Sequence, residues 1–463
     1  MTEQLKLKLN DSKATRWGAL VIVAFTMMAA YYVNDVVAPL KTMLETDLAW
    51  SSTDFGFFTG GYSFLNVFFL MLIWGGLILD RFGIRFTGKL ATILMVGGTA
   101  LEYYAMTRLA GTDATLFGIN EIFGYKTGVF VAFAGYSIFG VGAEVAGITV
   151  SKIIAKWFKG KELATAMGVQ VALARIGSQA GYAVAIPLAR AFGISTPVLL
   201  GLVLLLGGMI AFFVFTVMDK KLDKQMEAAA IAAGTEDEEE KFSFKDVKNI
   251  LVNPGFWLIA LLCVLFYSCV FPFQKFASEL MIIKYGINEN VAGTFAGLPA
   301  LGALILTPVF GGFIDKRGKS ASIMLLGSAM LICVHFIYAI PDINYWLVAI
   351  VLMIILGIAF SLVPSAMWPA VAKIFPVSQL GTAYALIFFI QNIGLWGIPT
   401  LIGWVLDAYC ISGKKPDGTN MYDYTVPMCI FTGIACLSLV VALLLKKADR
   451  KYGYKLEEPN IQK

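Results

Sequence analysis

The chain has 463 residues, of which 58% are hydrophobic and only 14% are charged, and its mean hydropathy is +0.76. A soluble globular domain cannot bury so much apolar surface, so this composition excludes an ordinary soluble protein and indicates an integral membrane protein. The formal net charge of +5 says little about a ligand, because basic residues in short loops mainly determine how a membrane protein is oriented.

Apolar stretches of about 20 residues recur along the chain, which is the length that an α-helix needs to cross a hydrocarbon core of about 30 Å. Backbone polar groups cannot face lipid unpaired, so the sequence predicts an all-α integral membrane protein. The first stretch is too long for a cleaved secretory signal and is expected to remain as a spanning helix. The twelve predicted transmembrane helices lie at 17–40, 55–78, 88–108, 127–152, 162–190, 195–218, 255–280, 290–314, 320–341, 345–372, 379–406 and 424–446.

Basic residues favour one side of the predicted membrane. They precede the first span and follow spans two, four, eight and twelve, which all lie on one side when the count is even. We therefore expect both termini to be cytoplasmic. A charged segment of partly low complexity separates spans six and seven. The sequence thus predicts an N-terminal six-helix bundle at 1–218, a cytoplasmic linker at 219–254, and a C-terminal six-helix bundle with a cytoplasmic tail at 255–463.

The two halves repeat one another. The segment "GLILDRFGIR" (76–85) shares its frame with "GGFIDKRGKS" (311–320) at a separation of 235 residues. Further on, "AKWFKGKELATAM" (155–167) matches "AKIFPVSQLGTAY" (372–384) at a separation of 217. Two pseudo-symmetric six-helix halves are typical of a transporter whose site lies between the halves, near the bilayer midplane.

The repeated G-x-x-x-D-[RK]-x-G frame follows the second span and again the eighth, and it resembles the loop motif of the major facilitator superfamily. The resemblance implies the fold of that superfamily, in which the aspartate caps a helix or pairs with an arginine and so holds one conformation. A phosphate loop in the second copy is excluded, because five residues separate Gly312 from Gly318. The residues expected to form the gating motif are Asp80, Arg81, Gly83, Asp315, Lys316 and Gly318.

Two charged side chains lie deep inside predicted spans. Glu144 is 16 residues before the loop at Gly160, and Arg175 is 15 residues after it, so both reach a similar depth near mid-membrane. An ionised group costs at least about 2.5–3.5 kcal/mol at that depth, so each is expected to face a partner or a wet cavity. Alternatively, the two neutralise each other as a packing pair. Their counterparts in the repeat, Ser361 and Asn392, are neutral, so the fold itself does not require a charge pair there.

Other polar and aromatic residues in the spans are candidates for the same site. Lys275, near a helix-kinking proline in span seven, is either a second cation for a ligand or a lysine that extends to the interface. Asn34 and Asp35 end the first span, where a solvated helix end is an equal alternative. The predicted substrate-binding residues are Glu144, Arg175, Asn392, Tyr62, Asn66, Tyr267, Lys275 and Trp368.

Several strings resemble one branch of the superfamily, the lysosomal dipeptide uniporters and their prokaryotic relatives. They are "FGVGAE", "KWFKGKEL", "LARIGS", "YSCVFPF", "WPAVAKIFP", "QLGTAYAL" and "IQNIGL". The resemblance implies that Glu144 binds the ammonium of a dipeptide and Arg175 its carboxylate. A zwitterion needs such an anion and cation, with neutral groups such as Asn392 and Tyr62 for its peptide bond. Contacts to the two termini predict broad side-chain tolerance, with transport by uniport or coupled to protons.

The remaining expectations concern class and location. No nucleophile motif, metal cluster or soluble catalytic domain is visible, so we expect no enzymatic activity, no metal site and no cofactor. The expected partners are a dipeptide and the lipid bilayer, with no nucleic acid, for a monomeric protein. Tyr136 stands where an arginine is common in the superfamily, which argues against proton coupling through that arginine.

Short outer loops and a short N-terminal tail without an acidic dileucine signal predict a prokaryotic cytoplasmic (inner) membrane and no obligate accessory subunit. The alternative function is an organic-anion antiporter of the same superfamily. There, Arg175 and Lys275 would bind two carboxylates, and Glu144 would be structural.

Overall fold

The computed structural model describes residues 8–111, 115–158, 161–233 and 244–459, and twelve helices of this part have 17 or more residues. These long helices are α1 (Lys13–Val36), α3 (Ser52–Phe68), α4 (Met71–Arg108), α5 (Thr127–Trp157), α6 (Leu163–Phe192), α7 (Thr196–Ala233), α9 (Pro254–Tyr285), α11 (Leu298–Arg317), α12 (Ser320–Ala339), α13 (Trp346–Ile374), α14 (Val377–Tyr409) and α15 (Thr425–Tyr452). The short elements are η1 (Leu9–Asp11), η2 (Ala38–Leu40), α2 (Lys41–Leu48), α8 (Phe244–Val252), α10 (Glu289–Ala296), β1 (Glu121–Ile122), β2 (Tyr125–Lys126), β3 (Ile411–Lys414) and β4 (Asn420–Tyr422).

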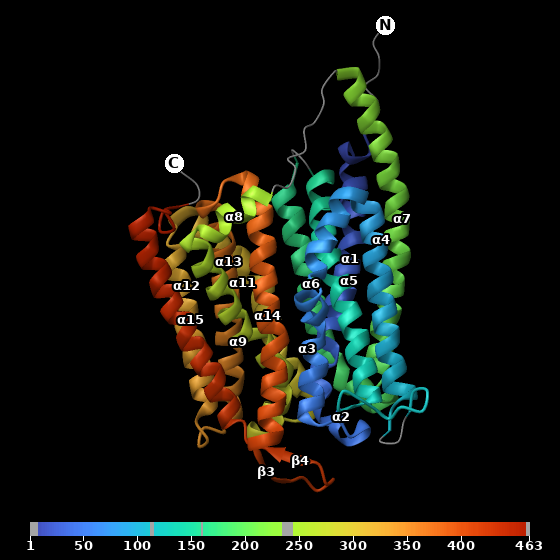
Figure 1. The fold of residues 1–463 in the computed structure, drawn as a ribbon, viewed down its shortest axis with the longest axis vertical. Helices are drawn as coiled ribbons and strands as arrows, with labels where there is room; N and C mark the ends of the chain where they lie inside the picture. The colour runs from blue at the N-terminus through green and yellow to red at the C-terminus, as the bar shows by residue number, and fades with distance from the viewer. Residues whose placement is uncertain (1–7, 112–114, 159–160, 234–243, 460–463) are drawn as a thin grey trace.

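The long helices form two groups that stand side by side (Figure 1). We call α1 to α7 the N-half and α9 to α15 the C-half; each contains six long helices. The start of α1 and the end of α15 lie at one end of the molecule, which we call the termini face. The hairpin of β3 and β4, together with α2, lies at the opposite end, which we call the hairpin face (Figure 1).

The composition of these helices is that of a protein embedded in a membrane. Nine helical segments of the described chain are long and apolar enough to cross a bilayer, and the bent pair of α3 and α4 makes a tenth. The prediction of an all-α, multi-pass membrane protein with twelve long helices is therefore confirmed. The two antiparallel hairpins, β1 with β2 and β3 with β4, are additions that the sequence analysis did not predict.

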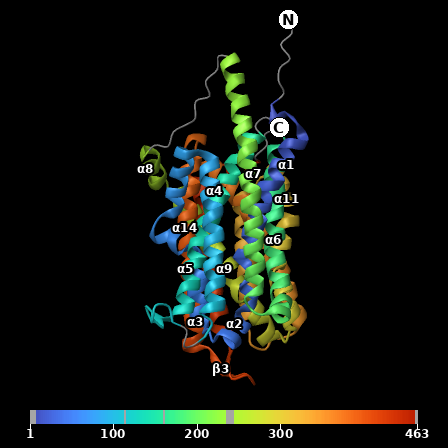
Figure 2. The ribbon, with the colours of Figure 1, turned by 90° about the vertical axis from the view of Figure 1, so that its right-hand side faces the viewer.

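Three predicted spans differ from the structure by more than a few residues at their ends. The second span breaks after Phe68, where Leu70 has a φ of +54°, and α3 meets α4 at an angle of 58°. The eighth span is divided at Gly297 into α10 and α11. Helix α7 continues to Ala233, well past the predicted end at 218, because the residues that follow are mostly strong helix formers. Its last turns extend beyond the neighbouring helices at the termini face (Figure 2). Part of the predicted linker, 234–243, lies outside the described residues.

The last glycine of the repeated loop motif has a positive φ in both halves. Gly83 has a φ of +73° and Gly318 a φ of +71°, in the region that residues with a Cβ atom rarely adopt. Gly83 kinks α4 without ending it, whereas Gly318 ends α11. A Cβ atom at Gly318 would also overlap the backbone of Glu457 and Glu458, which pack against the start of α12.

We expect Gly318→Ala to lower the stability of the folded protein by about 1–2 kcal/mol, because alanine is strained at a positive φ. Gly311→Ala is the matched control: it lies in the same motif, inside α11, with open space around its would-be Cβ atom. The control should be neutral or slightly stabilising. Midpoints of thermal unfolding in detergent would compare the two, and equal midpoints would contradict the strain argument.

Candidate functional site

A cavity of about 660 Å³ lies between the two halves. Its charged lining residues are Glu144 and Arg175 from the N-half and Lys275 from the C-half. The C-half wall is otherwise mainly aromatic and apolar; its aromatic members are Tyr267, Phe271, Phe360, Trp368 and Phe388. The cavity thus places charges of both signs opposite a wall of aromatic rings.

Glu144 lies near the middle of α5, and close helix packing brings it to a hydroxyl group on α3. A Cβ atom at Gly140 would overlap the Tyr62 carbonyl oxygen, so only glycine allows α5 and α3 to approach this closely. The Tyr62 hydroxyl then donates a hydrogen bond of 3.0 Å to Glu144 Oε1. Tyr62 and Glu144 both line the cavity.

Arg175 lies near the middle of α6 and is positioned in a similar way. A Cβ atom at Gly177 would overlap the backbone of Met28, so the glycine lets α6 pack tightly on α1. The guanidinium carbon of Arg175 lies 4.8 Å from the ring centroid of Phe360 and 5.6 Å from that of Tyr31. Neither ring was a sequence candidate. Phe360 could have been noticed because it directly precedes Ser361, the repeat counterpart of Glu144.

Glu144 and Arg175 do not form an ion pair with each other. Within the part of the chain that the structure describes, neither has a side chain of opposite charge within 4.0 Å. The packing pair that the sequence left open is therefore not formed in this structure. Both ionic groups remain available to a molecule in the cavity.

Lys275 is compensated by the other half of the protein. Its Nζ lies 3.1 Å from Asp35 Oδ1 and donates a hydrogen bond of 2.6 Å to the carbonyl oxygen of Asn34, at the end of α1. The Asp35 carboxylate also accepts hydrogen bonds from the Ser178 hydroxyl and the Asn34 amide. Asp35 is only 7% exposed, so this helix end is buried and paired across the halves.

The remaining sequence candidates divide into two groups. Tyr267 and Trp368 line the cavity: Tyr267 stacks on Phe271, and Trp368 stacks on Phe388. Asn66 and Asn392 are buried and do not line the cavity. The Asn392 amide donates to the carbonyl oxygen of Phe388 one turn earlier, which directs it along its own helix.

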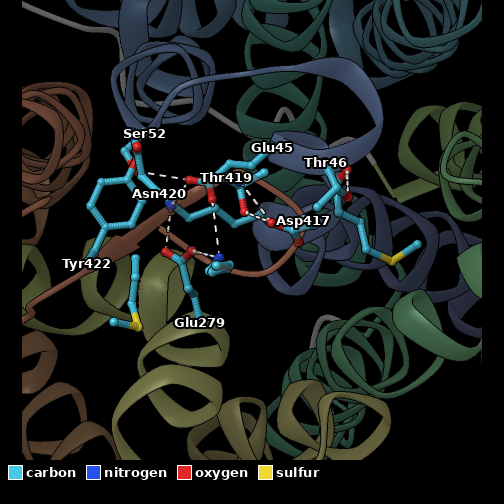
Figure 3. A network of polar contacts seen from close by, with 12 residues as sticks. Glu45, Thr46, Ser52, Glu279, Asp417, Thr419, Asn420 and Tyr422 are labelled. Carbon is cyan, nitrogen blue, oxygen red and sulfur yellow. Dashed lines mark hydrogen bonds and ion pairs between the residues drawn. The ribbon is translucent and has the colours of Figure 1, made fainter. Parts of the chain in front are cut away.

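The hairpin face is closed by a buried group of charges that we call the hairpin-face cluster: Lys41, Glu45, Glu279 and Lys415. Lys41 Nζ lies 2.5 Å from both Glu45 and Glu279, which come from α2 and α9. Lys415, in the β3–β4 hairpin, lies 3.7 Å from Glu45 and 3.6 Å from Glu279. The Glu45 and Glu279 side chains approach the hairpin from opposite sides (Figure 3).

Further bonds fix the hairpin in this position. The Asp407 carboxylate accepts hydrogen bonds from the backbone N–H groups of Ser52 and Thr53 at the start of α3, and from the Tyr422 hydroxyl. Burial raises the pKa of Tyr422, so its hydroxyl stays protonated as a donor. The Tyr424 hydroxyl donates to Glu279. The N-half and C-half are thus joined at this face by several buried polar contacts.

The gating motif lies at the termini face, away from the cavity. Asp80 Oδ1 is 3.1 Å from Lys152 Nζ on α5, and the Arg81 guanidinium lies over the ring of Phe82. Asp80 therefore pairs with a lysine of the N-half, whereas the resemblance implied either a helix cap or an arginine partner. Asp315 and Lys316 occupy the last turn of α11.

We expect Asp35→Asn to destabilise the protein by about 3–5 kcal/mol, because it leaves the Lys275 ammonium buried without its counter-charge. The double variant Asp35→Asn/Lys275→Met should recover much of this loss. Unfolding in detergent should therefore be strongly non-additive, whereas Asp342→Asn, at an exposed position, should change little. Additive losses in the double variant would show that the pair contributes nothing as a pair.

Several known transporters are similar to this chain in sequence. The chain is 28% identical to the lysosomal dipeptide transporter MFSD1 of Homo sapiens over 458 residues, which cover 95% of this chain and 88% of the relative. It is 27% identical to MFSD1 of Danio rerio, over 93% of this chain and 86% of the relative. MFSD1 of Gallus gallus is 33% identical over 287 residues, which cover 59% of this chain and 62% of the relative.

Solved structures agree on the fold. A variant of the nucleoside transporter NupG superposes with a TM-score of 0.67 at 12% identity, over 92% of this chain and 98% of that protein. A bacterial homologue of the human lysosomal transporter Spinster superposes with a TM-score of 0.63 at 14% identity, over 96% and 98% of the two chains. The family model of the Major Facilitator Superfamily matches residues 20–399 and 278–458. The predicted fold is confirmed, and the chain belongs to the Major Facilitator Superfamily.

Proposed function

We propose that this protein moves dipeptides across a membrane by alternating access, with broad tolerance of their side chains. The observation that carries the proposal is one cavity in which a carboxylate, Glu144, and a guanidinium, Arg175, both lack an ionic partner among the described residues. A dipeptide is a zwitterion, so its ammonium and its carboxylate complement these two groups. Its peptide bond meets the neutral lining, where Tyr62, Gln170 and Gln391 offer hydrogen-bonding groups.

The names of the curated relatives support the same substrate class, since they are lysosomal dipeptide transporters. For this chain we propose the cytoplasmic membrane of a prokaryote, with the termini face in the cytoplasm, because the basic loops gather on that side.

Uniport and proton coupling remain two versions of the proposal. Dipeptide accumulation in liposomes with and without a pH gradient would distinguish them, since only coupled transport concentrates substrate when a gradient is applied.

An organic-anion antiporter fits the cavity less well. That function needs two cations for two carboxylates, and the second cation would be Lys275. Asp35 already compensates Lys275 at 3.1 Å. A dianion would have to displace a buried ion pair, and it would also face the carboxylate of Glu144, which lines the same cavity.

The proposed cycle begins with the cavity accessible from the termini face. The exposed Ser151, near the end of α5 at that face, belongs to the lining. The hairpin-face cluster and the Asp35–Lys275 pair join the halves on the other side of the cavity. Alternating access then requires these contacts to part while the halves approach each other at the termini face.

If Glu144 binds the substrate ammonium, an N-acetylated dipeptide should bind wild-type protein at least about ten-fold more weakly than the free dipeptide, because the half-buried carboxylate is left without a counter-charge. Glu144→Gln should weaken the free dipeptide strongly and the acetylated one much less. Calorimetric titration of both proteins with both ligands gives the coupling free energy between Glu144 and the substrate ammonium.

Arg175→Ala should abolish uptake of the free dipeptide into liposomes while the protein stays monodisperse. Independent effects of acetylation and Glu144→Gln, or near wild-type uptake by Arg175→Ala, would contradict the assignment.

Closure of the hairpin face should depend on Glu279, the C-half partner of Lys41. In a background without native cysteines, spin labels at the exposed positions of Thr46 and Asp342 report the separation of the two halves at this face. We expect Glu279→Gln to increase the population with the longer separation. Glu121→Gln, an exposed carboxylate on β1 outside the cluster, is the control and should leave the distances unchanged. Identical distance distributions in both variants would exclude the cluster as a closure device.

A further inference from the structure

The guanidinium of Arg175 lies over two aromatic rings that belong to different halves of the protein. Tyr31 is on α1 of the N-half, and Phe360 is on α13 of the C-half. The guanidinium carbon is nearer to Phe360, at 4.8 Å from the ring centroid, than to Tyr31, at 5.6 Å. Both separations lie within the range in which a cation is attracted to the electron-rich face of a ring. Two π faces therefore lie beside this cation, where a carboxylate would otherwise compensate it.

The ring of Phe360 is fixed in its orientation. Its side chain is only 2% exposed. It packs edge-to-face against Phe271, at 5.3 Å and 81°, and against Tyr267, at 6.2 Å and 88°, both on α9. Such contacts restrain the plane of the ring. A leucine would fill much of the same space but would present no quadrupole to the guanidinium.

A contact with a ring does not use the hydrogen-bonding edge of a guanidinium. A guanidinium carries its N–H donors in its own plane, so a ring can cover its face while a carboxylate binds at its edge. A carboxylate on the protein would compete with the substrate for those donors, and an aromatic ring does not. The ring can therefore compensate this half-buried cation without occupying the donors that would bind a carboxylate.

We propose that Phe360 is a positioning residue that holds the Arg175 guanidinium by a cation–π contact and so keeps its donors oriented for an incoming carboxylate. The part that concerns the carboxylate rests on the proposed dipeptide transport. The contact between Phe360 and Arg175 stands on the structure alone. Because the two residues belong to different halves, the contact also joins the halves at the depth of the site.

The sharpest test replaces Phe360 with mono-, di- and trifluorophenylalanine by nonsense suppression in the full chain. Each fluorine withdraws electron density from the ring face and changes the ring volume little. We expect the affinity for a free dipeptide, measured by calorimetry, to fall stepwise to about ten-fold below wild type with three fluorines. Phe431 on α15 is the matched control, because it is equally buried and packs edge-to-face against Phe273, but does not line the cavity. The same series at Phe431 should leave the affinity flat.

A second readout separates the contact from the transport function. In protein without ligand, the thermal unfolding midpoint should fall with each fluorine at Phe360, and this slope should vanish in an Arg175→Gln background. A flat stability series, or one unaffected by Arg175→Gln, overturns the cation–π contact. A stability slope with unchanged dipeptide affinity overturns the positioning role. If wild-type protein binds no dipeptide, the proposed function has failed, and the stability series still decides the contact.

Discussion

The arrangement of this protein depends on the high free energy of an ionic group inside a membrane bundle that lacks a counter-charge. Most of the deep charges avoid that cost by pairing. Lys275 pairs with Asp35, and the four members of the hairpin-face cluster compensate one another within a few ångströms. Glu144 and Arg175 depart from this rule and face a shared cavity instead. Glu102 on α4 is also buried without an ionic partner among the described residues, but it does not line the cavity. Of the charged residues that line the cavity, Glu144 and Arg175 are the two without an ionic partner in the described part of the chain, and we assign the substrate to them.

The sequence was sufficient for the parts of this structure that depend on local composition and on the repeat. Helix number, the two six-helix groups and the depths of Glu144 and Arg175 follow from apolar length, from duplication and from a rise of 1.5 Å per residue. The positive φ of Gly83 and of Gly318 matches the repeated motif in which both were noticed. Such features need no knowledge of which helices are neighbours.

Features that depend on partners from distant segments could not be predicted in this way. The sequence left two roles for Lys275, a cation for a ligand or a lysine that extends to the interface. In the structure its ammonium is paired with Asp35, which is 240 residues away in the chain. Asn392 lies at the right depth, yet its amide bonds to its own helix and does not line the cavity. The hairpin that carries Lys415 is a short irregular insertion without a hydrophobic period. In each case the partners of the side chain depend on the rotation of a helix about its axis or on the position of a loop. The depth of a residue in the membrane, which the sequence does give, does not determine either.

The hairpin-face cluster divides into two electroneutral halves. Lys41 and Glu45 both belong to the N-half, 2.5 Å apart, and Lys415 and Glu279 both belong to the C-half, 3.6 Å apart. When the halves separate, each half keeps one cation and one anion of the cluster. Neither half is then left with a net charge from the cluster at this face. The halves are therefore joined at this face by short-range contacts such as the Lys41–Glu279 ion pair, and not by a long-range attraction between surfaces of opposite net charge. The closed and open forms of this face can consequently lie close in free energy, which a carrier requires if it is to visit both forms in every cycle.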